Sequence, residues 1–93
     1  MIKSFKDKRT EDIYNNVVVK KIELKILKKA LRRLKYIDAA KSIKDLTVPP
    51  SNKLEKKKGK LKDFYAVWVN DQYRVIFRWI DGNAYDVQFT DYH

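Results

Sequence analysis

The C-terminal segment 64–93 constrains the fold most, because it reads as three antiparallel strands joined by two turns. Asn70-Asp71 is a candidate two-residue hairpin turn, since both residues tolerate a positive φ. Asp81-Gly82 is the pair that type I′ hairpin turns favour. The sequence therefore predicts a β-meander whose strands cover residues 64–69, 72–80 and about 83–90.

The second predicted strand alternates between apolar and basic side chains. One set suits the face of the sheet that a helix covers, namely Tyr73, Val75, Phe77 and Trp79. Arg74 and Arg78 share the opposite face, where two guanidinium groups are costly to bury without anions. They could form a structural salt bridge, to Asp86 or Asp91, or a phosphate site, because guanidinium binds phosphate through two hydrogen bonds.

Two helices are predicted before the meander. The first runs over residues 8–15 with Asp7 as its N-cap. The second runs over residues 22–40, where apolar residues recur every three or four positions, at Ile22, Ile26, Leu27, Ala30, Leu31, Leu34 and Ile37. Basic residues lie off this stripe, at Lys25, Lys28, Lys29, Arg32, Arg33 and Lys35. The stripe predicts packing on the sheet, and the basic outer face could be solvated, touch phosphates, or bind a membrane surface or a calmodulin-type partner.

The remaining segments are shorter. Residues 2–5 alternate weakly and are expected to add a short strand to the sheet. Residues 42–45 carry a Ser-x-x-Asp capping pattern and predict one helical turn, which Pro49-Pro50 then interrupts. Residues 53–62 hold six lysines around Glu55 and a glycine, so they form either a plain surface loop or a phosphate-handling edge beside the sheet.

Composition narrows the function classes. A chain of 93 residues predicts one domain, residues 1–93. Its net charge of +10 indicates a polyanionic partner such as DNA, RNA, a membrane surface or an acidic protein, unless the charge serves solubility alone. With no cysteine and one histidine, disulfides and a structural zinc site are not expected, and no cofactor is predicted. No apolar run approaches the roughly 18 residues of a membrane span, and no signal-peptide pattern opens the chain, so a cytoplasmic location is expected.

Residue types suited to RNA cleavage occur in the second half of the chain, at Glu55, Lys58, Arg74, Asp91, Tyr92 and His93. Cleaving RNA without a metal needs a base for the 2′-hydroxyl proton and an acid for the leaving 5′ oxygen. It also needs cations that neutralise the pentacoordinate phosphate. These side chains supply all three types, but their spacing does not show that they meet.

The run from Asn70 to Arg74 and the closing Asp91-Tyr92-His93 are the most specific of several motifs that resemble the HigB group of RelE/ParE-type toxins. The resemblance covers nearly the whole chain. The matching stretches are residues 1–5, 52–55, 69–74, 77–79, 81–85 and 91–93, with the lysine-rich turn around Gly59.

The resemblance implies an α+β, RelE-like fold, with two N-terminal helices packed on a twisted antiparallel sheet. It implies the toxin of a type II toxin–antitoxin system, a ribosome-dependent and metal-independent endoribonuclease that cleaves mRNA and inhibits translation. The implied partners are the ribosome, mRNA and a HigA-like helix-turn-helix antitoxin, with operator DNA bound only through the antitoxin and no membrane partner.

The resemblance also assigns roles to residues. It places catalytic and phosphate-contacting functions on Lys58, Arg74, Asp91, Tyr92 and His93, and we add Glu55 as a catalytic candidate and Lys57 and Arg78 as RNA-binding candidates. Some members carry histidine where this chain has Glu55. Either Glu55 is the general base and His93 the acid, or Glu55 orients Lys58 while His93 carries out most of the proton transfer.

Two other functions remain open from the sequence. The ParE branch has the same fold, inhibits DNA gyrase and needs no nuclease residues, so the fold does not decide the activity. A basic nucleic-acid-binding module without catalysis would also account for the charge.

Overall fold

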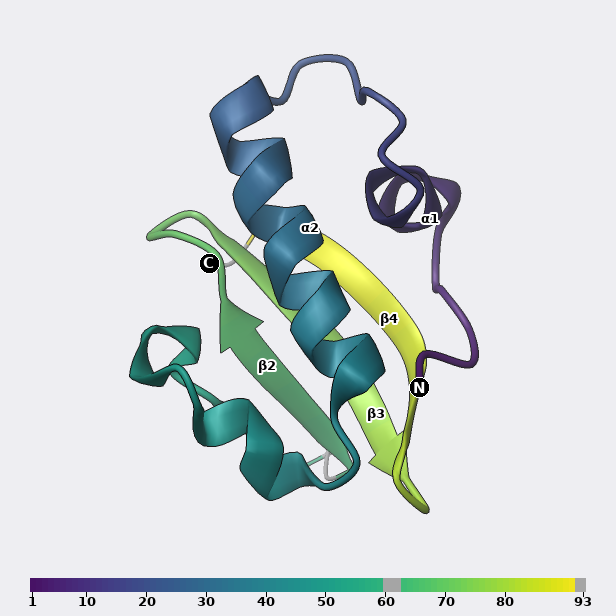
Figure 1. The fold of residues 1–93 in the computed structure, drawn as a ribbon, viewed down its shortest axis with the longest axis vertical. Helices are drawn as coiled ribbons and strands as arrows, with labels where there is room; N and C mark the ends of the chain where they lie inside the picture. The colour runs from purple at the N-terminus through teal and green to yellow at the C-terminus, as the bar shows by residue number, and fades with distance from the viewer. Residues whose placement is uncertain (60–62, 92–93) are drawn as a thin grey trace.

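The computed structural model describes residues 1–59 and 63–91, which form helices packed on one antiparallel sheet (Figure 1). The strand order is β1-β2-β3-β4, and each of these neighbouring strand pairs is antiparallel. The elements are α1 (Lys8–Tyr14), α2 (Leu24–Ala39), the 3₁₀ helices η1 (Ile43–Thr47) and η2 (Pro50–Asn52), and the strands β1 (Glu55–Lys56), β2 (Phe64–Trp68), β3 (Tyr73–Ile80) and β4 (Asn83–Asp91). The predicted α+β class, with two N-terminal helices and a C-terminal meander, is confirmed.

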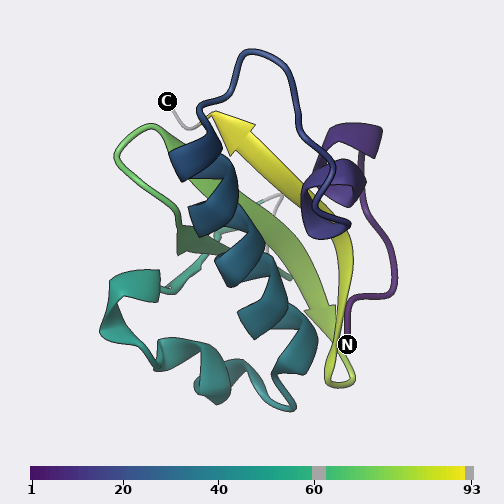
Figure 2. The same cartoon turned by 45° about the horizontal axis from the view of Figure 1, so that its top comes forward.

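Helix α2 lies across one face of the sheet (Figures 1 and 2) and provides the centre of the core. Its buried apolar side chains, Leu27, Ala30, Leu34 and Ile37, belong to one cluster with Val67, Val75, Phe77 and Phe89 from the strands. Each large side chain in such a cluster contributes about 1.5–3 kcal/mol by leaving water. The predicted apolar stripe is therefore confirmed, although Ile26 and Leu31 are only half-buried.

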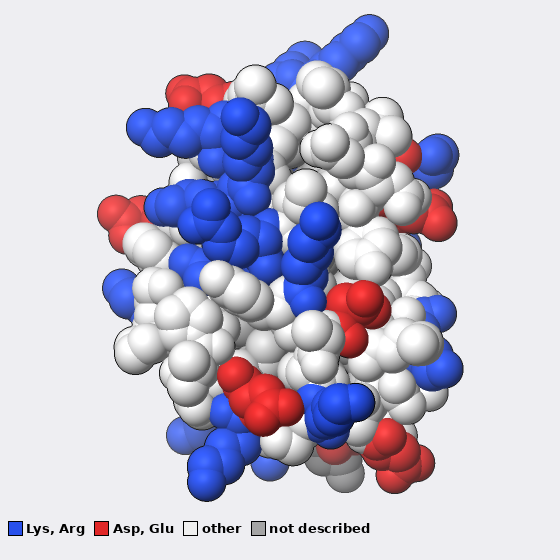
Figure 3. Space-filling model, viewed as in Figure 1, with Lys and Arg blue, Asp and Glu red and all other residues white. Residues whose placement is uncertain are grey.

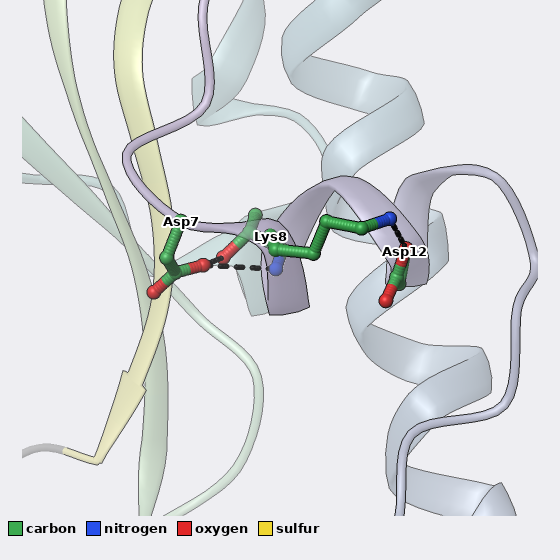
Figure 4. Close-up of polar contacts among 4 residues, drawn as sticks. Asp7, Lys8 and Asp12 are labelled. Atoms are coloured by element: carbon green, nitrogen blue, oxygen red, sulfur yellow. Dashed lines mark hydrogen bonds and ion pairs between the residues drawn. The ribbon is translucent and has the colours of Figure 1, made fainter.

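Helix α1 lies beside β4 (Figure 2), and Figure 4 shows the hydrogen bonds of its N-terminal cap. Asp7 Oδ1 accepts hydrogen bonds from Thr10 N (2.9 Å) and Thr10 Oγ1 (2.6 Å), which confirms the predicted cap. The same hydroxyl oxygen accepts a hydrogen bond from Phe89 N at 2.9 Å. Lys8 Nζ lies 2.8 Å from Asp12 Oδ1 along the exposed side of the helix. One buried threonine thus satisfies the helix cap and a backbone group of β4.

The two predicted hairpin turns differ in outcome. Asp81 and Gly82 have φ values of 50° and 79°, and Ile80 pairs with Asn83, so the tight turn between β3 and β4 is confirmed. The two-residue turn at Asn70-Asp71 is wrong, because β2 ends at Trp68 and β3 begins at Tyr73. Asn70 Oδ1 instead accepts hydrogen bonds from the backbone N–H groups of Gln72 and Tyr73 and builds a wider loop.

The N-terminal segment adds isolated bridges rather than a separate strand. Ile2 and Phe5 make parallel bridges to Ala84 and Val87 of β4. The predicted helical turn at residues 42–45 is confirmed as the start of η1. At the N-terminus of this 3₁₀ helix, Asp45 Oδ2 accepts hydrogen bonds from the backbone N–H groups of Lys41 and Ser42. In the described part of the chain, no helix is long and apolar enough to cross a membrane.

The packing of α2 predicts that substitutions on its buried side cost much more stability than substitutions on its exposed side. Leu34→Ala should lower the free energy of unfolding by about 2–5 kcal/mol, because it removes most of a fully buried side chain and leaves a cavity in its place. Lys28→Ala, at an exposed position of the same helix, should change it by less than about 0.5 kcal/mol. Denaturant unfolding of both variants measures the difference, and equal small effects would contradict the packing.

The cap of α1 predicts a pH dependence of stability. Burial raises the pKa of Asp7, but hydrogen bonds from Thr10 and Gln88 outweigh it, so this pKa lies below its usual value. A depressed carboxyl pKa stabilises the fold above the unfolded-state pKa of about 3.9, and this contribution is lost as the pH falls through the folded-state pKa. The stability advantage of the wild type over Asp7→Asn should therefore shrink below about pH 4. An advantage that stays constant or grows in acid would be the opposite result.

Candidate functional site

The strand register arranges the candidate residues in three rows on the face of the sheet opposite α2, which we call the arginine face. Directly paired residues of adjacent strands point to the same side, so each row follows from the register. Rows two residues apart along a strand are separated by roughly 7 Å. The first row is Lys57, Phe64, Arg78 and Tyr85; the second is Glu55, Ala66, Ile76 and Gln88; the third is Trp68, Arg74 and Thr90.

The middle row carries the carboxylate of the predicted site. Glu55 is exposed at the edge strand β1, and its Oε1 accepts a hydrogen bond from Lys57 Nζ at 3.3 Å. The Lys57 side chain is only 12% exposed, whereas that of Glu55 is 53% exposed. Lys58 is exposed, and the contact expected between Glu55 and Lys58 is instead made by Lys57. Glu55 therefore presents a solvent-accessible carboxylate beside a half-buried ammonium group.

Arg74 is held in place by the loop between β2 and β3. Its Nη1 donates hydrogen bonds to the carbonyl oxygens of Asn70 and Tyr73, the latter at 3.0 Å. Asn70 in turn is fixed by the loop hydrogen bonds to its own side chain. The guanidinium of Arg74 is thus oriented before any ligand arrives, which is the arrangement that electrostatic stabilisation of a phosphate requires.

Arg78 has an acidic partner on the arginine face. Its Nε lies 3.2 Å from Asp86 Oδ2, so one of the two predicted salt bridges is confirmed. Asp86 has a φ of 54° and lies where the β3–β4 register shifts, so a bulge in β4 brings its carboxylate to Arg78. The guanidinium also lies 5.9 Å from the centre of the Tyr85 ring. Arg78 is therefore partly neutralised, and its side chain is 38% exposed.

Asp91 is separated from this arrangement by strand alternation. Asp91 pairs with Tyr73, whose side chain packs against the core, so the Asp91 side chain points to the α2 side of the sheet. Its Oδ2 accepts a hydrogen bond from Gln72 Nε2 at 3.1 Å. Tyr92 and His93 lie outside the described residues.

A cationic cluster around Trp68 was not predicted. Lys53 Nζ lies 4.3 Å from the centre of the Trp68 ring, Lys29 Nζ lies 5.7 Å from it, and the Arg74 guanidinium carbon lies 5.9 Å from it. These residues come from α2, from the segment after η2 and from β3. The available signal was an aromatic residue at a strand end in a basic chain, but only the register shows that Trp68 shares a row with Arg74.

The prediction that Arg33 lies on the exposed outer face of α2 is wrong. It was predicted among the exposed basic residues, but it is only 6% exposed, and burial lowers the pKa of its guanidinium. Its Nη1 donates a 2.7 Å hydrogen bond to Asn52 Oδ1. Asn52 Nδ2 donates to the carbonyl oxygens of Leu46 (3.1 Å) and Val48 (3.3 Å). The helical spacing supplied a signal, because Arg33 lies three residues after the buried Ala30 and beside Leu34.

The other basic residues of α2 do form an exposed surface. Figure 3 shows lysine and arginine side chains gathered over the upper part of this helix. A groove of about 320 Å³ on the same helix is lined by Lys28, Leu31, Arg32, Lys35 and Tyr36. This surface faces away from the sheet, so the protein has two basic regions, which meet at Trp68 between Lys29 and Arg74.

Solved structures confirm the fold class. The YoeB–YefM complex from Staphylococcus aureus matches with a TM-score of 0.64 at 20% identity, over 100% of this chain and 98% of that one. The YoeB dimer from the same organism matches with a TM-score of 0.61 at 21% identity, over 99% and 94%. At this level of identity the likeness establishes the fold alone.

Sequence relatives establish the family. Toxin HigB-1 of Vibrio cholerae serotype O1 is 40% identical over 85 residues, which cover 90% of each chain. Endoribonuclease HigB of Proteus vulgaris is 31% identical over 93 residues, the full length of both. The sequence model described as RelE-like toxin of type II toxin-antitoxin system HigB matches residues 3–93. The chain therefore belongs to the HigB-like family of RelE-like toxins of type II toxin–antitoxin systems.

Proposed function

We propose that this toxin is an endoribonuclease that cleaves mRNA on the ribosome without a metal ion, as one domain spanning residues 1–93. The observation that carries the proposal is the strand register, which sets Glu55, Lys57 and Arg74 on one face of a rigid sheet. A carboxylate and two cations on adjacent rows are the groups that metal-independent phosphodiester cleavage requires. The full-length relationship to the Proteus vulgaris protein named Endoribonuclease HigB supports the same activity.

The residues divide the chemistry between charge neutralisation and proton transfer. Arg74, Lys57 and the exposed Lys58 neutralise the phosphate, and Arg78, held by Asp86, contacts the RNA nearby. A base removes the 2′-hydroxyl proton, the 2′ oxygen attacks phosphorus, and an acid protonates the leaving 5′ oxygen. His93 shares these two roles with Glu55 or with Asp91, and Tyr92 stacks on or positions a base.

The proposed partners follow from the family and from the two basic regions. Membership of a toxin–antitoxin family supports an antitoxin as a partner, and we propose that it is a HigA-like helix-turn-helix protein. The toxin would bind operator DNA only through this antitoxin. Lysines on the outer face of α2, such as Lys28 and Lys35, dock on ribosomal RNA, while the arginine face receives mRNA. This activity places the toxin in the cytoplasm with the ribosomes.

Purified protein in a translation extract tests the activity against its alternatives. Breaks in the mRNA that keep the phase of the codons would support ribosome-dependent cleavage. Gyrase-dependent DNA breaks without mRNA cleavage would identify a ParE-like gyrase inhibitor. Binding to nucleic acid without any breaks would leave a non-catalytic module, and either of these outcomes would refute the proposal.

Arg74→Ala should reduce mRNA cleavage by about 10²–10³-fold, the scale for losing one preorganised transition-state donor. Its Nη1 donates to the carbonyls of Asn70 and Tyr73 where the β2–β3 loop meets β3, outside the hydrophobic core, so the folded state should survive. Lys44→Ala removes the same charge from an exposed position in η1 and should leave cleavage unchanged. A variant that loses stability but keeps its activity per folded molecule would make Arg74 a structural residue.

His93→Ala should abolish growth arrest and reduce cleavage by about 10²–10⁴-fold, because general acid–base groups contribute on that scale. Imidazole has an ordinary pKa of about 6.5, so His93 is suited to proton transfer near neutral pH. Antitoxin binding should be retained, which controls for folding. Undiminished growth arrest in cells that express the variant would remove His93 from the mechanism and assign proton transfer to Glu55, Asp91 or Tyr92.

A further inference from the structure

We propose that Trp68, Lys29 and Lys53 form a second phosphate subsite, which holds the phosphodiester next to the one that is cleaved. The subsite rests on the proposed nuclease function and defines how the RNA strand lies on the arginine face. It continues the third row of that face beyond Arg74, towards α2. On the sheet, Trp68 of β2 lies between β1, which carries Glu55, and β3, which carries Arg74.

The argument begins with three like charges around one aromatic ring. Lys53, Lys29 and Arg74 place cationic groups 4.3, 5.7 and 5.9 Å from the centre of the Trp68 ring. In the ion pairs found within residues 1–59 and 63–91, no carboxylate lies against Lys29 or Lys53. Cations gathered around one ring repel one another, and an anion bound among them reduces the repulsion.

The position of Lys53 is built into the fold. It adopts a left-handed backbone conformation with φ 44°, which is unfavourable for a residue with a side chain. The preceding Asn52 is fully buried and fixed by its hydrogen bonds to Arg33, Leu46 and Val48. The buried network thus holds a strained residue whose ammonium lies over Trp68, which indicates a preorganised site rather than a chance surface contact.

The same geometry selects a phosphate rather than a base. A base would have to stack on a face of the indole ring, but the Lys53 ammonium already lies over that ring at 4.3 Å. Trp68 is half-buried, whereas Lys29 and Lys53 are exposed. The ring therefore positions the two ammonium groups by cation–π attraction, and these groups meet the ligand.

The location links the subsite to the cleavage chemistry. Trp68 is two residues along β2 from Ala66, which pairs with Glu55, so the subsite lies one row, roughly 7 Å, from the catalytic carboxylate row. An RNA strand crossing the rows would place the cleaved phosphate beside Glu55 and the next one at Trp68, between Lys29 and Lys53. These two lysines are then positioning residues that fix the register of the RNA.

The test uses the full-length toxin and a short single-stranded RNA at low salt. The indole N–H resonance of Trp68, assigned by Trp68→Phe, should shift on RNA addition, and an abasic ribose-phosphate oligomer should shift it too. Lys53→Ala and Lys29→Ala should each reduce the slope of log affinity against log salt by about 0.7, the value for one single-strand phosphate contact. Lys44→Ala should leave the slope unchanged.

Outcomes that overturn the subsite are distinct from those that overturn the nuclease. A Trp68 resonance that does not move, whether RNA binds elsewhere or not at all, would refute the subsite. A resonance that responds to RNA but not to the abasic oligomer would refute phosphate recognition in favour of base stacking. Intact mRNA in the translation extract together with a responding Trp68 would refute the proposed nuclease and retain the phosphate subsite.

Discussion

The packing of α2 on one face of the sheet is the constraint on which the rest of the structure depends. Leu34 and Ile37 are fully buried against strand residues such as Phe77. Because side chains alternate along a strand, this packing commits the other residues of β2 and β3 to the opposite face. Arg74 and Arg78 lie there as a consequence, and the same helix sends its own lysines outward. One hydrophobic contact thus creates both basic regions.

A buried polar contact links the helix to the candidate site. A buried guanidinium is costly unless it is hydrogen-bonded, and Asn52 supplies an acceptor to Arg33 at 2.7 Å. Asn52 also satisfies two backbone carbonyls, so one side chain joins α2, η1 and η2. Lys53 follows directly, and its position over Trp68 depends on this contact. The fold and the proposed RNA register therefore share a structural element.

Local patterns predicted the elements of the fold well. Strand alternation, the Asp81-Gly82 turn and the apolar stripe of the long helix are each determined by residues close together in sequence. The Asn70 loop was missed because its side chain replaces backbone groups in the turn. The burial of Arg33 and the cluster at Trp68 depend on contacts between distant segments, which no local period contains. The site could be predicted as residue types, but its rows required the strand register.

The central claim is that mRNA lies on the arginine face and not on the outer face of α2. Photo-crosslinking of 4-thiouridine-containing mRNA in stalled ribosome–toxin complexes, followed by mapping of the crosslinked peptides, tests it most directly. The account predicts adducts on Phe64 and Tyr85, whose aromatic rings lie on that face. Adducts confined to Tyr36 and its neighbours along the α2 groove would contradict it.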